Sequence, residues 1–305
     1  MAYSIFIDGE AGTTGLQIRE RLEPREDIRL ITIDPGRRKD ADARREAFER
    51  ADIGILCLPD EAAREAVELT RDLDVRLIDA STAHRVDDRW VFGFPELSDE
   101  IRDQIAEARL VSNPGCYSTG SIAIIAPLVA AGLIDEDEPL AINAVSGYTG
   151  GGKALIAEYQ DGGAPAHFVY GLTQRHKHIP EIMAHAGLLV QPVFSPAVGN
   201  FAQGMVVQLP LHLDDERTVA ALFEALSEHY DGQQFVQVVD AEEVGSRLVP
   251  TAMNGTNVMR ISVHGDDDNG CATVVAVLDN LGKGASGAAI QNANIMLGLD
   301  EAEGL

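Results

Sequence analysis

The chain has 305 residues, of which 45% are hydrophobic, and a mean hydropathy near zero, as expected for a globular protein of about two domains. Its 49 acidic side chains against 24 basic ones give a formal charge of −25, which argues against nucleic acids and anionic membranes as partners. No apolar run reaches the ~20 residues that cross a bilayer. Three cysteines without metal-ligand spacing argue against a disulfide framework, so we expect a reducing, cytoplasmic location.

A predicted strand and a glycine-rich turn come first in the chain. Residues 3–8 (YSIFID) form the strand pattern, and a Gly-x-x-Gly-x-x-Gly turn joins it to the amphipathic segment 16–22. Such glycines let backbone N–H groups approach a pyrophosphate at a helix N-terminus, so the turn predicts a nucleotide site rather than a plain structural turn. The residues expected to bind the cofactor here are Gly9, Gly12, Thr13, Thr14 and Gly15.

The next predicted strand, residues 28–33, ends in Asp34 and is followed by Arg37, Arg38 and Lys39. An acid at this point favours the free ribose 2′-hydroxyl of NAD, whereas arginines accommodate the 2′-phosphate of NADP. Because the basic residues outnumber the acid, we predict NADP (NADPH) as the cofactor, bound by Arg37 and Arg38. A solvated charge run after the strand is the alternative.

Strand and helix patterns then alternate, with strands at 52–58 and 75–79 and a helix at 62–73 between them. This alternation indicates right-handed βαβ units and a parallel, Rossmann-like sheet. Ligands of such sheets bind at the carboxyl ends of the strands. The polar residues that follow the strand end at 79 and could line the site are Ser81, Thr82 and Arg85.

Cys116 follows a break in the strand pattern of residues 108–112. Pro114 and Gly115 end that pattern, and an apolar helix pattern begins directly afterwards, so Cys116 is expected at a helix N-terminus. Unpaired N–H groups and the positive end of the helix dipole favour an anion there. A thiol of ordinary pKa, ~8.5, is only about 3% ionised at pH 7, so this position would activate it. We favour a nucleophile over a buried structural cysteine.

The pattern changes after the Cys116 helix. A strand at 139–146 leads into a second glycine-rich loop, residues 147–153 (GYTGGGK). Later stretches alternate apolar and polar residues, which indicates strands of a mixed or antiparallel sheet, and helical patterning between them is limited to residues 219–230. The strands predicted in this way are 203–211, 235–239, 257–264 and 271–278.

The predicted fold class is α/β, with an N-terminal Rossmann-like parallel-sheet domain and a second α+β domain with a mixed or antiparallel sheet. The nucleotide domain is expected to span residues 1–116, and the catalytic and oligomerisation domain residues 117–283. Residues 284–305 contain a helix rich in glycine and alanine, which allow close backbone approach. We expect that helix to pack back on the nucleotide domain.

Residues 172–182 hold the densest cluster of titratable groups. His176 and His178 are two residues apart, which on an extended chain places both on one face. A metal site is one alternative, although the spacing implies no third ligand, and a neutral surface cluster is another. We favour a general acid/base and anion-contact role, because a thiolate mechanism needs a proton donor with a pKa near 7, which unperturbed histidine has.

A nucleotide turn, one activated cysteine and a histidine together suit reduction through a thioester. The cysteine would attack an acyl carbon, a leaving group would depart, and a hydride from the cofactor would reduce the thioester and release an aldehyde. The chain has only four lysines, at 39, 153, 177 and 283. If the segments that carry them converge, they make a basic patch for an anionic ligand.

Four motifs resemble the N-acetyl-γ-glutamyl-phosphate reductase family, and the opening segment resembles its shorter branch. The motifs are SNPGCYSTG at 112–120, SGYTGGGK at 146–153, HKHIPE at 176–181 and DNLGKGASG at 279–287. This resemblance covers almost the whole chain. It implies NADPH-dependent reduction of N-acetyl-γ-glutamyl phosphate to the semialdehyde plus phosphate, a step of arginine biosynthesis, by a homo-oligomer, usually a dimer or a tetramer.

The resemblance also implies site residues. Cys116 matches the nucleophile, and the segment from His176 through His178 to Glu181 matches the acid/base region. Because the substrate carries a phosphate and a carboxylate, a protein of charge −25 needs local positive groups to bind it. The substrate candidates are Arg85, Asn113, Gly147, Lys153 and Arg175, with Lys177 and Lys283 as further cations; Asn280 and Lys283 are the additional cofactor candidates, and no metal is expected.

Other readings of the sequence remain open. Aspartate- and aminoadipate-semialdehyde dehydrogenases share the expected architecture and are the alternative acyl-phosphate reductases. A Cys/His acyltransferase or hydrolase would need no nucleotide. A nucleotide-sensing binding protein would carry out no chemistry at all, so that replacing Cys116 would leave every activity intact.

Overall fold

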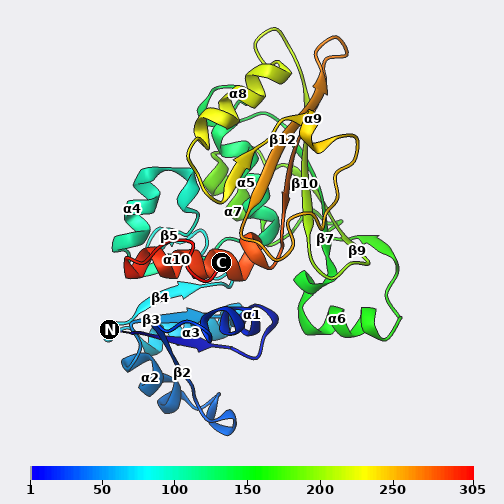
Figure 1. Ribbon diagram of the computed structural model, residues 1–305. Coiled ribbons are helices and arrows are strands. Elements are labelled where there is room, and N and C mark those ends of the chain that lie inside the picture. Colours follow the sequence, from blue (N-terminus) through cyan, green and yellow to red (C-terminus); the bar gives the residue numbers. More distant parts are fainter. Residues whose placement is uncertain (1) are drawn as a thin grey trace. The chain divides into compact units, whose positions relative to one another are not determined.

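The computed structural model describes residues 2–305, whose contacts divide the chain into two compact units. One unit comprises the chain up to Pro114 together with Ala285–Leu305, and the other is Gly115–Gly284. Figure 1 follows the chain from the strands of the first unit through the second unit to helix α10. The second unit therefore begins directly before Cys116 and ends directly after Lys283.

The first unit contains a six-stranded sheet in the order β2-β1-β3-β4-β6-β5. Every neighbouring pair is parallel, which confirms the predicted Rossmann-like parallel sheet. Its strands are β1 (Tyr3–Asp8), β2 (Ile28–Ile31), β3 (Ile53–Leu56), β4 (Arg76–Asp79), β5 (Val91–Phe92) and β6 (Leu110–Ser112).

Alternating strand residues bury the two faces of this sheet under different helices. Ile5 and Ile7 belong to a core cluster with residues of α1, α4 and α10, whereas Phe6 belongs to a cluster with residues of α2 and α3. This two-residue period is why the strands are apolar throughout, and it leaves the strand ends as the places for polar side chains. The helices are α1 (Thr13–Leu22), α2 (Ala41–Glu49), α3 (Asp60–Leu69), α4 (Asp99–Glu107) and α10 (Gly287–Leu297).

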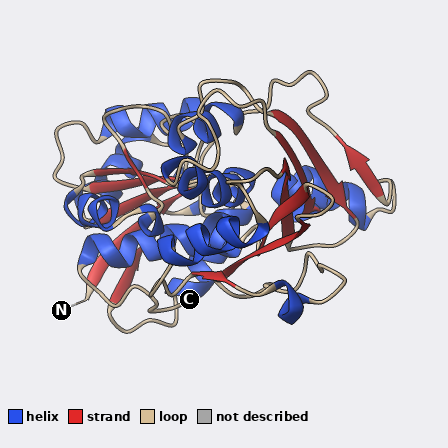
Figure 2. Ribbon diagram, turned by 90° about the horizontal axis from the view of Figure 1, so that it is seen from above, coloured by secondary structure: helices blue, strands red, loops and turns tan. Residues whose placement is uncertain are grey.

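The second unit contains a seven-stranded sheet in the order β11-β12-β13-β10-β7-β9-β8. Two of its pairs, β7 with β9 and β11 with β12, are parallel and the others are antiparallel, which confirms the predicted mixed sheet. The strands, red in Figure 2, are β7 (Ala141–Gly147), β8 (His167–Val169), β9 (Val193–Gly199), β10 (Met205–His212), β11 (Val236–Val238), β12 (Met259–Asp266) and β13 (Cys271–Leu278).

Helix α5 (Cys116–Ala130) is the central helix of the second unit. It packs against β10 and β13 of the sheet and against helices α7 and α8. Because it contacts neighbours on several sides, apolar residues occupy most of its surface, and residues such as Ile122 and Ile125 have no exposed area. The other helices are α6 (Gly152–Gln160), α7 (Ile179–Ala186), α8 (Val219–His229) and α9 (Ala241–Val244).

Two local expectations are wrong. Helical structure between the later strands is not limited to residues 219–230, because α9 adds one turn whose start is capped by the Asp240 carboxylate. The segment before α7 is not extended: His178 is the N-cap residue of α7 with φ −84° and ψ −15°. Pro180 lies in the first turn of α7, where its fixed φ favours a helix start.

Candidate active site

The glycine turn of the first unit leaves the start of α1 open. Gly9 has φ +91°, and a Cβ there would lie 2.3 Å from the carbonyl oxygen of Cys57. Gly12 is the N-cap residue of α1 and has no side chain to cap the first N–H groups of that helix. A Cβ on Gly15 would lie 2.7 Å from the Gly9 carbonyl oxygen. The three glycines thus hold a tight turn whose N–H groups suit a phosphate.

Gly9→Ala is expected to destabilise the protein by at least about 2 kcal/mol, because it adds a left-handed backbone penalty to an overlap with Cys57. Urea unfolding measures the loss. Gly298→Ala is the matched control in the same unit, since Gly298 also has a positive φ, +67°, but has nothing within 4 Å of an added Cβ. Its expected cost is about 1 kcal/mol. Equal losses in the two variants would contradict the close approach at Gly9.

A pocket lies beside this turn, lined by the end of β1, the first turn residues and two cations. Its lining residues include Asp8, Gly9, Arg38 and Lys39. Asp34 faces its own turn instead, where its carboxylate accepts a hydrogen bond from the Gly36 N–H at 2.8 Å. Arg37 does not line the pocket and pairs with Asp40 at 3.2 Å. Thr13 and Thr14 form the first turn of α1 and are half-buried.

Two substrate candidates belong to the first unit. Arg85 is buried in the loop after β4, where its Nη2 donates to the Ala80 carbonyl at 3.0 Å. Asn113 has no exposed area, and its side chain spans two segments: Nδ2 donates to the Ala285 carbonyl at 3.0 Å, and Oδ1 accepts from Asn292 at 3.2 Å. Asn113 therefore fixes the end of β6 to the residues before α10.

Cys116 is the first residue of α5, as predicted, and its thiol is partly buried. The N-cap residue, Gly115, has no side chain that could cap the helix, so the helix start is available to a thiolate. Gly284 packs directly on the cysteine, since a Cβ there would lie 2.9 Å from the Cys116 Cβ. This close approach explains why residue 284 is a glycine, a role that the sequence did not predict.

The other two cysteines lie elsewhere. Cys57 follows β3, and burial, helped by the negative charges of Asp79 and Asp8, raises the pKa of its thiol to about 12. Cys57 therefore stays protonated at neutral pH. Cys271 is exposed at the start of β13, with Sγ 3.9 Å from Nδ1 of His212.

Glu181 connects the start of the cysteine helix with a histidine. Its carboxyl group is buried, and Oε2 accepts a hydrogen bond from the Gly115 N–H at 3.2 Å. Its other oxygen, Oε1, lies 3.9 Å from Nε2 of His178. The carboxylate thus accepts one N–H group at the N-terminus of α5 and faces the imidazole of His178, the N-cap residue of α7.

The two histidines lie together although the chain between them turns. Their ring centroids are 4.8 Å apart, and the ring of Tyr117 lies 6.0 Å from His176 and 5.9 Å from His178. Nδ1 of His176 accepts the backbone N–H of His178 at 3.2 Å, so that nitrogen carries no proton. Burial, and secondly the positive charge of Lys177, lowers the pKa of His176 to about 4. The expectation of an unperturbed imidazole is therefore wrong for His176.

The second glycine-rich loop is held by Asn280. Gly147 donates to the Gly204 carbonyl at 2.9 Å, and a Cβ on Gly147 would lie 2.4 Å from the Ala202 carbonyl oxygen. Asn280 accepts from the Gly204 N–H at 2.8 Å and donates to Thr149 Oγ1 at 3.2 Å. Both candidates therefore contribute to the shape of this loop.

The remaining predicted cations of the second unit differ in exposure. Lys153, Arg175 and Lys177 are exposed, whereas Lys283 is 1% exposed and its Nζ lies 5.8 Å from the centroid of the Phe235 ring. Throughout residues 2–305, no group of three or more potential ligands could hold a metal ion. Within the same range, none of the helices combines the length and the apolar character that crossing a membrane requires.

Family models and solved structures define the class of protein. Residues 15–108 match the model described as semialdehyde dehydrogenase, NAD binding domain, and residues 116–280 match its dimerisation domain. Aspartate semialdehyde dehydrogenase II of Vibrio cholerae has a TM-score of 0.71 at 14% identity, covering 97% of this chain and 98% of that chain. The Francisella tularensis enzyme gives 0.73 at 16% identity, covering 97% and 100%. Fold and domains are those of a nicotinamide-binding semialdehyde dehydrogenase.

Relatives with higher sequence identity show which family of semialdehyde dehydrogenases the chain belongs to. A Nostoc protein named N-acetyl-gamma-glutamyl-phosphate reductase 2 is 50% identical over 317 residues, which cover 99% of this chain and 98% of that protein. N-acetyl-gamma-glutamyl-phosphate reductase of Brucella ovis is 51% identical over 309 residues, covering 98% and 100%. The chain belongs to the N-acetyl-gamma-glutamyl-phosphate reductase family, which confirms the resemblance seen in its four motifs.

Proposed function

We propose that this protein catalyses the NADPH-dependent reduction of N-acetyl-γ-glutamyl phosphate to N-acetylglutamate semialdehyde and phosphate, a step of arginine biosynthesis. The observation that carries the proposal is the placement of Cys116 as the first residue of α5, beside a glycine N-cap that Glu181 contacts. Relatives that are about half identical over nearly the whole chain carry the reductase name in their descriptions.

The nucleophile of the proposed reaction is the Cys116 thiolate. Its sulfur attacks the acyl carbon, the carbon–oxygen bond to phosphate breaks, and a thioester with Cys116 remains. The departing phosphate takes one proton from solvent. The positive end of the α5 helix dipole favours the thiolate before the attack and after the product leaves. When bound, a reduced nicotinamide supplies the hydride that reduces the thioester carbon.

His178 is the proposed proton donor. It protonates the oxygen of the reduced tetrahedral carbon and takes the proton back as the carbon–sulfur bond breaks, which releases the aldehyde and restores the thiolate. His176 is unsuited to this task, because its Nδ1 accepts a hydrogen bond and its pKa lies near 4. Glu181 orients His178 from 3.9 Å. His176 keeps the turn before α7 in shape.

The substrate carries two anionic groups, for which the chain offers separate cations. Arg85 is the proposed contact of the phosphoryl group, because its guanidinium is fixed beside the carboxyl end of β4. Lys153 and Arg175 are exposed, which suits longer-range attraction of an anion. Gly147 and Asn280 shape the loop that carries Lys153, and Asn113 holds the end of β6 to the residues before α10.

NADP is the proposed form of the cofactor. The glycine turn and the open start of α1 fit a pyrophosphate, and the neighbouring pocket is lined by Arg38 and Lys39. A 2′-phosphate would place two negative charges beside these cations. Asp34, the acid that would favour NAD, is engaged with the Gly36 N–H.

Arg38→Ala is expected to raise the KM for NADPH roughly tenfold, the effect of losing one charge-assisted hydrogen bond, and to leave the KM for NADH unchanged. Steady-state kinetics with both cofactors measure the two KM values. Arg37→Ala is the control, since Arg37 pairs with Asp40 and does not line the pocket. Equal rises for the two cofactors would remove Arg38 from recognition of the 2′-phosphate.

A homo-oligomer, dimer or tetramer, is part of the proposal. Support comes from the name of the matched model over residues 116–280, which describes a dimerisation domain. The exposed apolar side chains of this unit include Leu172, Leu189 and Val193. Light scattering on the purified protein measures the mass of the assembly and so tests for a dimer or a tetramer. A cytoplasmic location is also proposed, because an active thiol and two further free cysteines suit a reducing compartment.

The test of the proposed function is the reverse reaction, in which NADP⁺ reduction is followed at the nicotinamide absorbance. N-acetylglutamate semialdehyde, phosphate and NADP⁺ are the reactants, with aspartate semialdehyde and the aminoadipate analogue as comparison substrates. The proposal predicts phosphate-dependent reduction and the highest kcat/KM with the acetylglutamate compound. Absence of reduction, or preference for another semialdehyde, would overturn it.

A further inference from the structure

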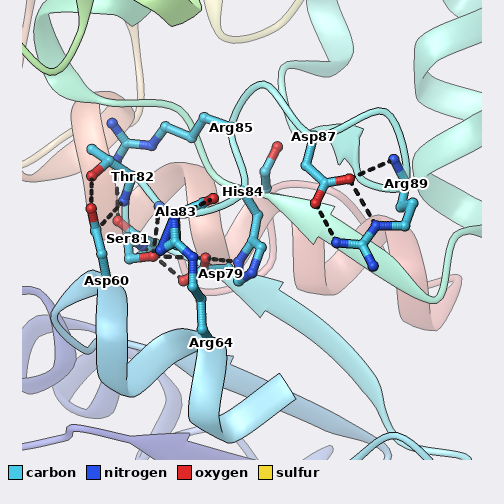
Figure 3. Close-up of polar contacts among 12 residues, drawn as sticks. Asp60, Arg64, Asp79, Ser81, Thr82, Ala83, His84, Arg85, Asp87 and Arg89 are labelled. Atoms are coloured by element: carbon cyan, nitrogen blue, oxygen red, sulfur yellow. Dashed lines mark hydrogen bonds and ion pairs between the residues drawn. The ribbon is translucent and has the colours of Figure 1, made fainter. Parts of the chain in front are cut away.

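The loop after β4 folds back on the end of its own strand (Figure 3). Asp79, the last residue of β4, has no exposed area. Its Oδ1 accepts the Ser81 N–H at 2.9 Å, and its Oδ2 accepts the Ser81 hydroxyl at 2.7 Å. The Ser81 oxygen in turn accepts the Ala83 N–H at 3.1 Å. One buried carboxylate thereby shapes the backbone of the next four residues.

His84 completes this arrangement from the far end of the loop. Its Nδ1 lies 2.6 Å from Oδ2 of Asp79, so the ring donates its Nδ1 hydrogen to the carboxylate. The same ring lies flat on Trp90, with centroids 4.4 Å apart and planes 12° apart. His84 is 5% exposed. A hydrogen bond and a stacking contact together fix a single position for this imidazole.

A second carboxylate holds the outer side of the loop. Asp60, the first residue of α3, accepts the Thr82 N–H at 3.0 Å and the Thr82 hydroxyl at 2.6 Å. Figure 3 shows the Asp60 and Asp79 contacts on either side of the loop, with Arg85 at its end. The loop is therefore bonded to the strand before it and to a neighbouring helix.

Stability alone does not account for these buried groups. Desolvation of a buried carboxylate offsets most of what its hydrogen bonds contribute, so apolar packing would stabilise the loop equally well. The bonds instead hold the loop after β4 in one conformation. That loop carries Arg85 at the carboxyl end of a parallel strand. A cation held in place before binding loses little conformational entropy when an anion arrives.

We propose that Asp79 and His84 are positioning residues, which fix the loop so that Arg85 meets the phosphoryl group of the substrate. The inference rests on the proposed function, since that function assigns Arg85 to the phosphoryl group. Asp79 and His84 do not touch the substrate; they act through the backbone of residues 80–85 and its bond from Arg85 to Ala80.

Two replacements of His84 separate its hydrogen bond from its packing. His84→Phe keeps a flat ring on Trp90 and removes the donor. His84→Asn removes the ring and keeps a nitrogen donor two bonds from Cβ, as in histidine. In the reverse assay we expect His84→Phe to raise the KM for phosphate about tenfold, the effect of one lost charge-assisted bond, with the KM for NADP⁺ unchanged. His84→Asn should stay within about threefold of the wild type.

Arg89→Ala is the matched control. Arg89 follows His84 in the chain and forms a bidentate pair with Asp87, which is also drawn in Figure 3. Unlike His84, the Arg89 side chain is 79% exposed. Its loss should leave the KM for phosphate unchanged. Ser81→Ala serves if His84→Phe does not fold, because it removes only the hydroxyl between Asp79 and Ala83; a KM raised about threefold is expected.

Calorimetric titration of inorganic phosphate into the same proteins separates this inference from the proposed function. Weaker phosphate binding in His84→Phe than in His84→Asn supports positioning, even if the wild type fails to reduce NADP⁺ and the proposed function falls. Equal phosphate affinity and KM in wild type and His84→Phe would overturn the inference while leaving the reductase intact. A loss in His84→Asn that matches the loss in His84→Phe would also overturn it, since packing would then be the cause.

Discussion

Replacing Cys116 by serine is expected to lower kcat in both directions by roughly a thousandfold or more, because the covalent route through a thioester is lost. A serine hydroxyl does not ionise near neutral pH, and the helix dipole that favours a thiolate is too weak to make a hydroxyl an anion. The measurement is the reverse assay with phosphate and NADP⁺. Binding of NADPH, followed by fluorescence, should be unchanged because Cys116 belongs neither to the glycine turn before α1 nor to the pocket beside it.

Cys271→Ser is the matched control for Cys116→Ser. Cys271 is an exposed thiol at the start of β13 and lies outside the helix start. Its replacement should leave kcat within about twofold of the wild type. Full activity of Cys116→Ser would fit the nucleotide-binding alternative and contradict the thioester mechanism. Turnover of an acyl substrate without any nucleotide would favour the hydrolase or acyltransferase instead.

His178→Asn is expected to lower kcat about 10²- to 10³-fold, the usual effect of losing a general acid/base. His176→Asn should cost less than about tenfold, because asparagine can still accept the His178 N–H and no proton transfer is lost. The comparison is informative since the two rings lie 4.8 Å apart in the same cluster. Stopped-flow measurement of the hydride step avoids a contribution from product release.

The pH dependence of kcat distinguishes the two histidines independently. The pKa of His176 near 4 means that only about one molecule in a thousand carries the charged ring at pH 7. If His176 were the acid, the rate would fall about tenfold for each pH unit above 4. We expect instead that the pH profile of kcat is the same in the wild type and in His176→Asn. A profile that falls tenfold per pH unit above 4 in the wild type, but not in His176→Asn, would assign the proton transfer to His176.

Local sequence patterns predicted the fold because each reports a short-range constraint. A short run of strand-type residues marked β1, alternation of apolar and polar residues marked β13, and the break at Pro114 and Gly115 marked the start of α5. The two wrong expectations about local conformation concern α9, which is a single turn, and His178, which is helical. In both places a cap or a proline sets the conformation over one turn, which is too short for a hydrophobic period to show.

The sequence by itself determined the chemistry available to this protein: a cysteine at a helix start, a glycine turn for a nucleotide, and a pair of histidines. Tertiary structure decided how those groups are used. Burial and Lys177 lower the pKa of His176, and a backbone N–H occupies its Nδ1. The contacts of Asp79 and of Gly284 likewise depend on atoms brought together by folding. Proton affinity and orientation depend on burial and on such contacts, so these properties could be read only after the fold was known.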